Sequence, residues 1–275
     1  MIRLFFFYLP ALAGLLTASA SAEDAITPTQ TMHLFNGKDL GNFYTWLADS
    51  GRADPDKVFS VAEYIDGGPA IRISGQRWGS LTTVKSYANY RLVVEFRWGL
   101  LTWADRKLGV RDSGVLVHGE GRDGASRPDF KGPWMRSIEC QVGEGIVGDF
   151  IGVGGYNEDG RRVVPEFTVK TRKVGRELFY DPAGQPVRAQ RVAWSGRAPG
   201  WTDTLGFRAK DDAESPWGQW TRLEVMCEGD NITHVVNGKV VNVATGASLT
   251  KGKILLQSEG AEVYYRRIDL EPLTR

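Results

Sequence analysis

Apolar and polar residues alternate with a period of two in several short stretches of this chain. The clearest are LVVEFRW (92–98), SGVLVHG (113–119), SIECQVG (137–143) and KILLQSEG (253–260). Such a period places successive side chains on opposite faces of a β-strand. No window of eleven or more residues carries the 3.6-residue stripe of an amphipathic helix. The pattern predicts an all-β protein.

Further β-type runs, bounded by Gly, Asn, Asp and Pro, precede and follow these four stretches. They span 70–75, 79–86, 149–156, 221–229, 232–245 and 262–273. Within 232–245, Asn237-Gly238 separates two apolar runs and predicts a hairpin with a type I′ turn. Many short antiparallel strands without helices indicate a sandwich or a barrel.

Burying the larger apolar set of each strand decides which residues point outward. The outward set is mostly polar: Glu95, Arg97, His118, Glu139, Gln141, Gln257 and Glu259, together with Leu116 and Leu255. If the four strands share one sheet, this face is dense in hydrogen-bond donors and acceptors and suits a sugar. A solvated face on which Glu95 and Arg97 pair with neighbouring charges explains the same pattern, and alternation does not decide whether the strands are adjacent.

The first 22 residues predict a secretory signal peptide, cleaved after Ala22, because Arg3 precedes an apolar run that ends in small residues. The run is short for a membrane span of about 20 residues. The expected location is therefore periplasmic or secreted. Residues 23–32 are expected to form a flexible segment, and 33–275 a single domain in which 157–218 is a loop-rich insertion.

Composition narrows the possible partners. Lys and Arg total 34 against 33 Asp and Glu, so the net charge of +1 favours neither nucleic acid nor a membrane surface.

Cys140 and Cys227 lie in apolar runs and are expected to be buried thiols, although a disulfide remains open in an exported protein. Five of the nine tryptophans lie in loop-like contexts, where one or two are expected to stack on a sugar ring: Trp103, Trp134, Trp194, Trp201 and Trp217.

Six motifs in a fixed order carry a resemblance to a known family. They are LFNGKDLGNFYTW, VVEFRW, DSGVLVHG, SIECQVG, WGQWTRLEVMCEGDNITHVVNGKVVN and KGKILLQSEGAEVYYRRIDLEPL, between Leu34 and Leu273. Together they resemble the 3-keto-disaccharide hydrolase domain family. The resemblance implies a concanavalin-A-like jelly-roll β-sandwich of two antiparallel sheets with long rim loops. It also implies exported bacterial proteins that hydrolyse glycosides oxidised at C3.

The chain departs from the family pattern at three positions. Asp112 replaces the usual Asn, His118 stands where Arg is common, and Glu259 occupies a position at which the family often has His. The E-x-Q strand is intact as Glu139 and Gln141. These departures leave the particular sugar and the acid and base groups open.

The implied chemistry starts from the ketone. A C3 ketone acidifies the hydrogen on C2, a base removes it, the enolate expels the group on C1, and water adds to the resulting enone. This route differs from the two-carboxylate mechanism of ordinary glycosidases. It requires a base, a stabiliser for the enolate oxygen and an acid for the leaving group.

The outward set supplies candidates for these roles. The catalytic candidates are Glu139, His118 and Glu259; the substrate-binding candidates are Glu95, Arg97, Arg111, Gln141 and Gln257. The sequence requires no cofactor. A divalent cation remains open, with Glu139, Glu95 and His118 as its candidate ligands.

Two other functions remain as alternatives to an enzyme acting on an oxidised glycoside. One is a lectin-like protein on the same fold that binds carbohydrate without catalysis. The other is a conventional glycosidase, which would need a second carboxylate a few residues from Glu139 on the same face; residue i+2 is instead the amide Gln141. The sequence does not indicate an oligomeric state.

Overall fold

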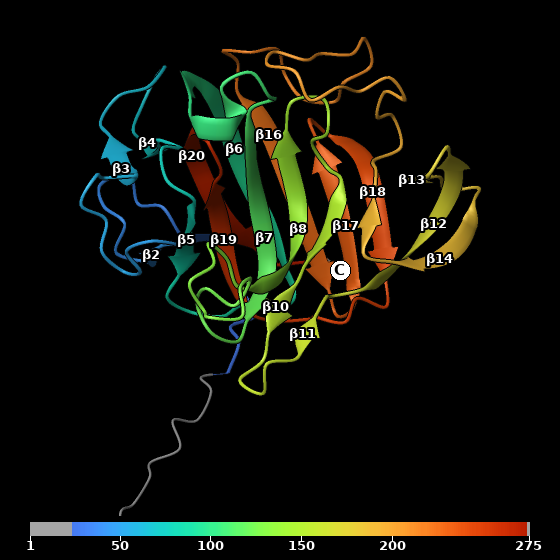
Figure 1. The fold of residues 1–275 in the computed structure, drawn as a ribbon, viewed down its shortest axis with the longest axis horizontal. Helices are drawn as coiled ribbons and strands as arrows, with labels where there is room; N and C mark the ends of the chain where they lie inside the picture. Colours follow the sequence, from blue (N-terminus) through green and yellow to red (C-terminus); the bar gives the residue numbers. More distant parts are fainter. Residues whose placement is uncertain (1–23, 274–275) are drawn as a thin grey trace, which may run out of the picture.

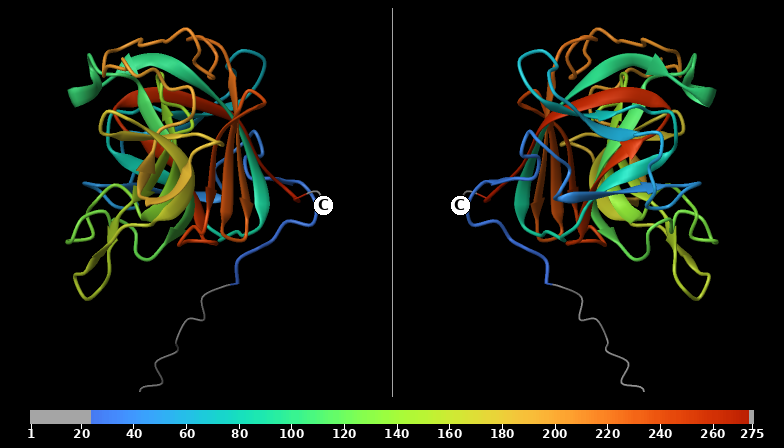
Figure 2. Two further views of the ribbon diagram at one scale, coloured as in Figure 1. Left: turned by 90° about the vertical axis from the view of Figure 1, so that its right-hand side faces the viewer. Right: turned by 90° about the vertical axis from the view of Figure 1, so that its left-hand side faces the viewer.

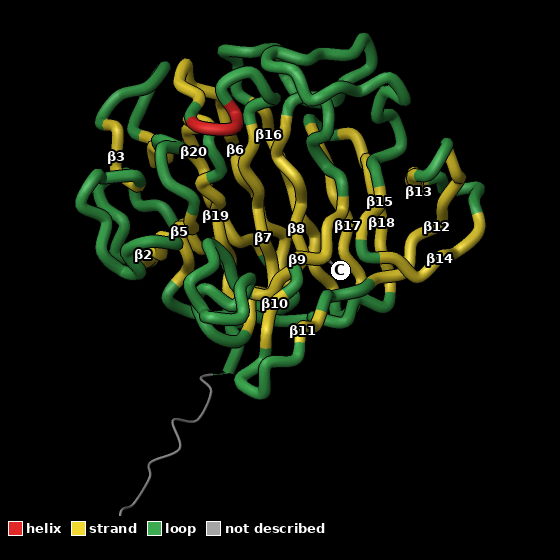
Figure 3. The backbone as a smooth tube through the Cα atoms, viewed as in Figure 1, coloured by secondary structure: helices red, strands yellow, loops and turns green. Residues whose placement is uncertain are grey.

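Two antiparallel β-sheets packed face to face make up the protein (Figure 1). The structure is a computed structural model that describes residues 24–273. The predicted signal peptide lies outside the described residues. Strands account for almost all the regular structure, as the tube in Figure 3 shows. The predicted all-β sandwich is confirmed.

The larger sheet has eleven strands. Its main path runs β13-β12-β18-β17-β16-β6-β20-β4-β3, with β1 paired to β20 and β14 paired to β12. The strands are β1 (Met32–His33), β3 (Phe59–Ala62), β4 (Ala70–Ile73), β6 (Tyr90–Thr102), β12 (Phe167–Val174), β13 (Glu177–Tyr180), β14 (Gln185–Ala189), β16 (Thr221–Glu228), β17 (Asn231–Val236), β18 (Lys239–Thr245) and β20 (Ala261–Glu271).

The smaller sheet has seven strands in the order β15-β9-β8-β7-β19-β5-β2. They are β2 (Phe43–Leu47), β5 (Gly79–Thr83), β7 (Asp112–Glu120), β8 (Arg136–Gly143), β9 (Phe150–Val153), β15 (Arg191–Val192) and β19 (Lys253–Ser258). A separate hairpin joins β10 (Gly155–Tyr156) to β11 (Arg162–Val163). Over residues 24–273 the only helix is the 3-10 turn η1 (Ala104–Arg106), and no helix there is long and apolar enough to cross a membrane.

The core lies between the facing sheets. Val94, Phe96 and Trp98 of β6 are buried in the same cluster as the inward residues of β7, β8 and β19. Those inward residues are Val115, Val117, Ile138, Cys140, Val142, Ile254 and Leu256. Each alternates with an outward neighbour, so period two assigned these apolar side chains to the correct face.

The β17–β18 hairpin also follows from local sequence. Asn237 and Gly238 have φ values of 47° and 79°, and Val236 pairs with Lys239 across the turn. Positive φ at both central residues is what a type I′ turn requires.

The two segments that were expected to be flexible or loop-rich, 23–32 and 157–218, both contain residues that contact the sandwich. Ile26, in the segment expected to be flexible, donates its backbone N–H to Ser86 O at 2.9 Å and forms a bridge with Tyr87. Part of the loop-rich stretch 157–218 adds short strands to the edges of both sheets. Residues 193–220 contain no strand and run as orange loops over one end of the sandwich, which the edge-on views of Figure 2 also show.

We expect both cysteines to be inert in the folded protein. Cys140 and Cys227 are free and fully buried, and burial raises the pKa of the Cys227 thiol to about 12 and that of Cys140 well above its usual value. Thiolate is the reactive form. Ellman's reagent should therefore release no chromophore from native protein and two equivalents after denaturation without reductant. Fewer than two equivalents after denaturation would indicate a disulfide.

Candidate active site

Residues 121–135 fold over part of the outer face of the smaller sheet. Trp134 donates its indole N–H to Gly79 O at 3.1 Å. Trp134 and Met135 pack against Leu116 and Leu255, the two apolar members of the outward set. These leucines are consequently buried, although they point away from the main core.

The uncovered part of this face forms a cavity of about 520 Å³. Strands β7, β8 and β19, with the residue that follows β19, supply its polar floor: Asp112, Glu139, Gln141, Gln257 and Glu259. Loops and neighbouring strands supply the walls, which include Arg106, Trp134, Ile151, Arg162, Arg191, Trp201 and Asp203.

Strand register explains why the floor residues meet. Leu116 lies opposite Glu139, and Gly114 lies opposite Gln141, across β7 and β8. Leu255 lies opposite Leu116 across β19 and β7. Residues opposite each other in an antiparallel pair share a face. The outward residues of three of the four alternating strands therefore converge.

Gly114 sits at the centre of the floor, where no side chain fits. A Cβ on this residue would lie 2.2 Å from Glu139 Oε1 and 2.4 Å from Gln257 Oε1. The absence of a side chain lets the carboxylate and the carboxamide approach the backbone of β7 from both sides.

Glu139 is the most chemically unusual residue of the floor. Its side chain is buried, and Oε1 has no hydrogen-bond partner within the described chain, as is also true of Gln257 Oε1. Burial raises the pKa of Glu139 well above its usual value, and the nearby charges of Glu259 and Asp112 raise it further. Both effects favour the protonated form of Glu139 over the ionised form.

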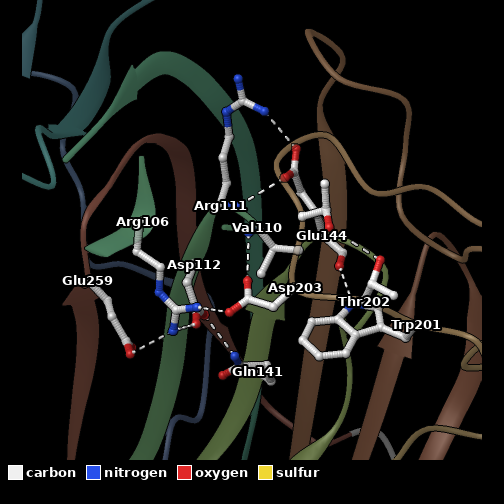
Figure 4. Close-up of polar contacts among 11 residues, drawn as sticks. Arg106, Val110, Arg111, Asp112, Gln141, Glu144, Trp201, Thr202, Asp203 and Glu259 are labelled. Carbon is white, nitrogen blue, oxygen red and sulfur yellow. Dashed lines mark hydrogen bonds and ion pairs between the residues drawn. The ribbon is translucent and has the colours of Figure 1, made fainter. Parts of the chain in front are cut away.

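Arg106 connects the other two carboxyl groups of the floor (Figure 4). From η1 it forms ion pairs with Asp112, with Glu259 at 3.4 Å and with Asp203 at 3.4 Å. Asp112 also accepts a hydrogen bond from Gln141 Nε2 at 2.7 Å. Its pKa is raised to about 6 by burial, against the lowering effect of Arg106. Burial and the charge of Asp112 raise the pKa of Glu259 to about 8.

Two further arginines stand at the rim. Arg162 and Arg191 line the cavity and are exposed. Neither forms an ion pair with another described residue, although the charge of Arg191 lowers the pKa values of Glu139, Asp112 and Glu259. They leave positive charge available to a ligand.

The structure brings together four of the predicted site residues: Glu139, Gln141, Gln257 and Glu259. Glu95 and Arg97 lie elsewhere, because β6 belongs to the larger sheet. Glu95 pairs with Arg266 at 2.6 Å and Arg97 with Asp66 at 3.4 Å, in the solvated, salt-bridged arrangement that was the alternative for these two residues.

His118 is not on the outer face as predicted. The β7–β8 register shifts between Val117 and Glu120, and His118 has a φ of 58°. Such a bulge reverses the face that a side chain takes. The ring meets Tyr90 edge-on at 5.9 Å, and Nδ1 lies 3.0 Å from Leu249 O. Burial lowers its pKa to about 4, so His118 is a neutral interior residue.

Arg111 points away from the cavity. Its guanidinium pairs with Glu144 at 2.7 Å and donates to Gly99 O at 3.2 Å, as Figure 4 shows for the Glu144 contact. The three candidate metal ligands lie in three different places. Glu139 is on the cavity floor, Glu95 is on the larger sheet and His118 is in the interior, so they do not form one set. Within residues 24–273, no group of three or more His, Cys, Asp or Glu side chains is arranged to hold a metal ion.

Several cavity residues were not identified from the sequence. Asp112 precedes Gly114 by two residues and Leu116 by four in the same strand, so its side chain points to the same face. Continuing the period-two pattern from Gly114 to Asp112 would have placed it on the floor. No local sequence pattern marks the other three. Arg106 comes from a 3-10 turn, Arg191 from an edge strand and Asp203 from a loop.

Of the five loop tryptophans, Trp134 and Trp201 line this cavity, Trp217 lines another, and Trp194 lies in the core.

The sandwich with this polar, tryptophan-bearing cavity is a carbohydrate-active, glycoside-hydrolase-like protein. More particularly, the chain belongs to the family of 3-keto-alpha-glucoside-1,2-lyase-like domains, whose model matches residues 30–271. The predicted family is therefore confirmed. No curated protein matches the chain.

Solved structures with similar architecture share little sequence with this chain. Two candidate glycosyl hydrolases from Parabacteroides distasonis ATCC 8503 are 18% and 16% identical, with TM-scores of 0.47 and 0.49. The alignments cover 89% of this chain in both cases, and 100% and 94% of those chains. A β-glucanase from Bacillus licheniformis is 13% identical with a TM-score of 0.43, covering 89% of this chain and 99% of that one.

We expect Gly114→Ala to destabilise the protein by about 1–3 kcal/mol, because the new methyl group overlaps two buried polar tips. Urea denaturation measures this loss. Gly68→Ala is the matched control, since a Cβ there meets nothing within 4 Å. Equal stability of the two variants would contradict the tight approach of Glu139 and Gln257.

The pH dependence of stability should report the buried carboxyl groups. The pKa of Glu259 is raised from 4.5 to about 8, so the folded state binds more protons than the unfolded state between these pH values. The free energy of unfolding therefore falls as pH rises through that window. Glu259→Gln removes this contribution, and the variant's melting temperature relative to wild type should be higher near pH 8 than near pH 4.5. An identical difference at both pH values would contradict the assignment.

Proposed function

We propose that this protein cleaves glycosides whose sugar ring carries a ketone at C3, by proton abstraction at C2 followed by elimination. The observation that carries the proposal is Glu139, a buried carboxyl group at the floor of the cavity with an unpartnered oxygen and a raised pKa. It lies close to a second titratable carboxyl group, Glu259, and both line one cavity.

The proposed reaction has three steps. A carboxylate takes the C2 hydrogen as a proton, and the C–H electron pair forms the enolate of the C3 ketone. The enolate then re-forms the carbonyl, making a C1–C2 double bond while the C1–O bond breaks and the leaving oxygen receives a proton. Water finally adds across C1–C2, placing OH on C1 and H on C2, so the products are the free 3-keto sugar and the released alcohol.

The surroundings of the two carboxyl groups assign the acid and the base. Burial raises the pKa of both groups, but Arg106 pairs with Glu259 at 3.4 Å and favours its ionised form, whereas Glu139 is more deeply buried and has no ion-pair partner among the described residues. A group that must be ionised needs the lower pKa and a group that must be protonated the higher one. Glu259 therefore acts as the base at C2, and Glu139 donates the proton to the leaving oxygen.

The remaining polar groups have supporting roles in this scheme. Arg191 is exposed at the rim without an ion pair to another described residue, and it offers positive charge to the developing enolate oxygen. Gln141 and Gln257 bind sugar hydroxyl groups from the floor, while Trp134 and Trp201 form walls on which a sugar ring can stack. The partner is an oxidised glycoside, and export by the N-terminal signal peptide would place the protein in the periplasm or outside the cell.

An isotope experiment tests the elimination. A 3-keto aryl glucoside with deuterium at C2 should react more slowly than the protiated compound, because the C2–H bond breaks in the first step. The rate of aryl alcohol release measures the effect on kcat/KM. Equal rates would remove C2 proton abstraction as a rate-contributing step.

Glu139→Gln is the companion variant for the same assay and should lose at least about 100-fold in kcat, the range for loss of a general acid. Glu95→Gln is the matched control, since Glu95 lies on the other sheet and pairs with Arg266. Full activity in Glu139→Gln would exclude the assigned role. Sugar binding by wild type without turnover of 3-keto-trehalose, 3-keto-lactose or the aryl glucoside would favour the lectin-like alternative.

A further inference from the structure

A second cavity, of about 380 Å³, lies between the end of β6 and the loop that follows Asp203. Its lining comprises Trp98, Arg111, Glu144, Leu205, Gly206, Phe207, Arg208, Glu214, Ser215 and Trp217. None of these residues lines the candidate active site. Glu144 separates the two cavities: its backbone oxygen accepts from Trp201 Nε1 at 2.9 Å, and its Oε2 accepts from Gly206 N at 2.9 Å.

Two polar atoms at this cavity are buried without a partner in the described chain. The Trp98 side chain lies in the core with its indole N–H unpaired. Glu214 is 6% exposed; its Oε1 accepts from Gly145 N at 2.7 Å, but its Oε2 accepts nothing. Buried polar atoms without partners are destabilising, and both residues line the same space.

The charges around this cavity are already neutralised by one another. Arg111 pairs with Glu144 at 2.7 Å and donates to Gly99 O. Glu144 Oε2 in turn accepts from the backbone N–H groups of Arg111 and Gly206. Arg208 donates to the backbone oxygen of Glu214 at 3.0 Å. Glu214 has no ion-pair partner among the described residues, but burial raises its pKa to about 8, so its carboxyl group is protonated near neutral pH. The site therefore presents hydrogen-bonding groups rather than a free ion.

The rest of the lining is apolar and partly open to solvent. Trp217 is 54% exposed and is anchored by a 3.4 Å hydrogen bond from its indole N–H to Gly99 O. Leu205 and Phe207 complete the apolar wall. An exposed, anchored indole beside two buried polar atoms suits a ring that has an apolar face and polar edges.

We propose that this second cavity binds one uncharged pyranose ring, independently of the candidate active site. A ring oxygen or hydroxyl accepts from Trp98 Nε1, a hydroxyl forms a hydrogen bond with the Glu214 carboxyl group at Oε2, and the C–H face of the ring stacks on Trp217. A purely apolar ligand would leave the Trp98 and Glu214 atoms unpaired. An anion would face the Glu214 carboxyl group while Arg111 remains bound to Glu144.

Calorimetric titration of the full chain tests this inference with methyl glycosides of glucose, galactose and mannose, which lack a C3 ketone. At least one should bind with a Kd on the order of 1 mM. Trp217→Ala should weaken that binding by about tenfold or more, through loss of the stacking surface. Trp220→Ala is the matched control and should leave binding unchanged, because Trp220 lines neither cavity and its indole donates to Asp66.

Two further variants separate this cavity from the candidate active site. Glu214→Ala removes the group at Oε2, so it should also weaken binding. Glu139→Gln should leave binding unchanged. Absence of binding by every glycoside, or binding that survives Trp217→Ala and Glu214→Ala, would overturn the inference. Binding lost only in Glu139→Gln would place the sugar in the candidate active site and leave the proposed catalytic function standing.

Discussion

The burial of three carboxyl groups on the outer face of one sheet is the constraint on which the site depends. Asp112, Glu139 and Glu259 lie together on the floor of one cavity, where desolvation disfavours ionisation. The charge of Asp112 raises the pKa values of Glu139 and Glu259, and that of Glu259 raises the pKa of Glu139 further. Arg106 offsets part of this cost by pairing with Asp112 and Glu259. Glu139 has no such partner among the described residues, so the floor holds carboxyl groups in two different electrostatic surroundings.

The backbone makes this crowding possible. Gly114 leaves space for the tips of Glu139 and Gln257, and a side chain there would displace both. The loop 121–135 contributes from the other side, because Trp134 covers Leu116 and Leu255 and so closes the apolar half of the face. The cavity is therefore what remains of a sheet face after one loop has buried its apolar part.

Both sheets carry alternating polar residues on their outer faces, but these residues lie in different surroundings on the two sheets. On the larger sheet, alternating charges pair across strands, as Arg266 does with Glu95. Solvent screens such a pair, and it contributes little to stability. On the smaller sheet the polar residues lie at the floor of a cavity walled by loops, where burial reduces that screening and shifts the pKa values of the carboxyl groups.

Strand orientation followed from the sequence wherever the backbone is regular. Period-two alternation correctly placed Phe96, Val115, Cys140 and Leu256 in the core, and Glu139 and Gln257 on an outer face, because strand geometry alone sets these orientations. It failed at His118, where a bulge with positive φ turns the side chain inward.

What the sequence determined by itself was local: the strands, their apolar faces, the Asn237-Gly238 turn, and the family to which the ordered motifs belong. Only the tertiary structure decided which strands share a sheet, and so separated Glu95 and Arg97 from Glu139 and Gln257. It also brought Arg106, Arg191 and Asp203 to the carboxyl groups from distant loops and an edge strand. Side-chain direction depends on the backbone of one strand, whereas adjacency depends on long-range pairing that no local pattern records.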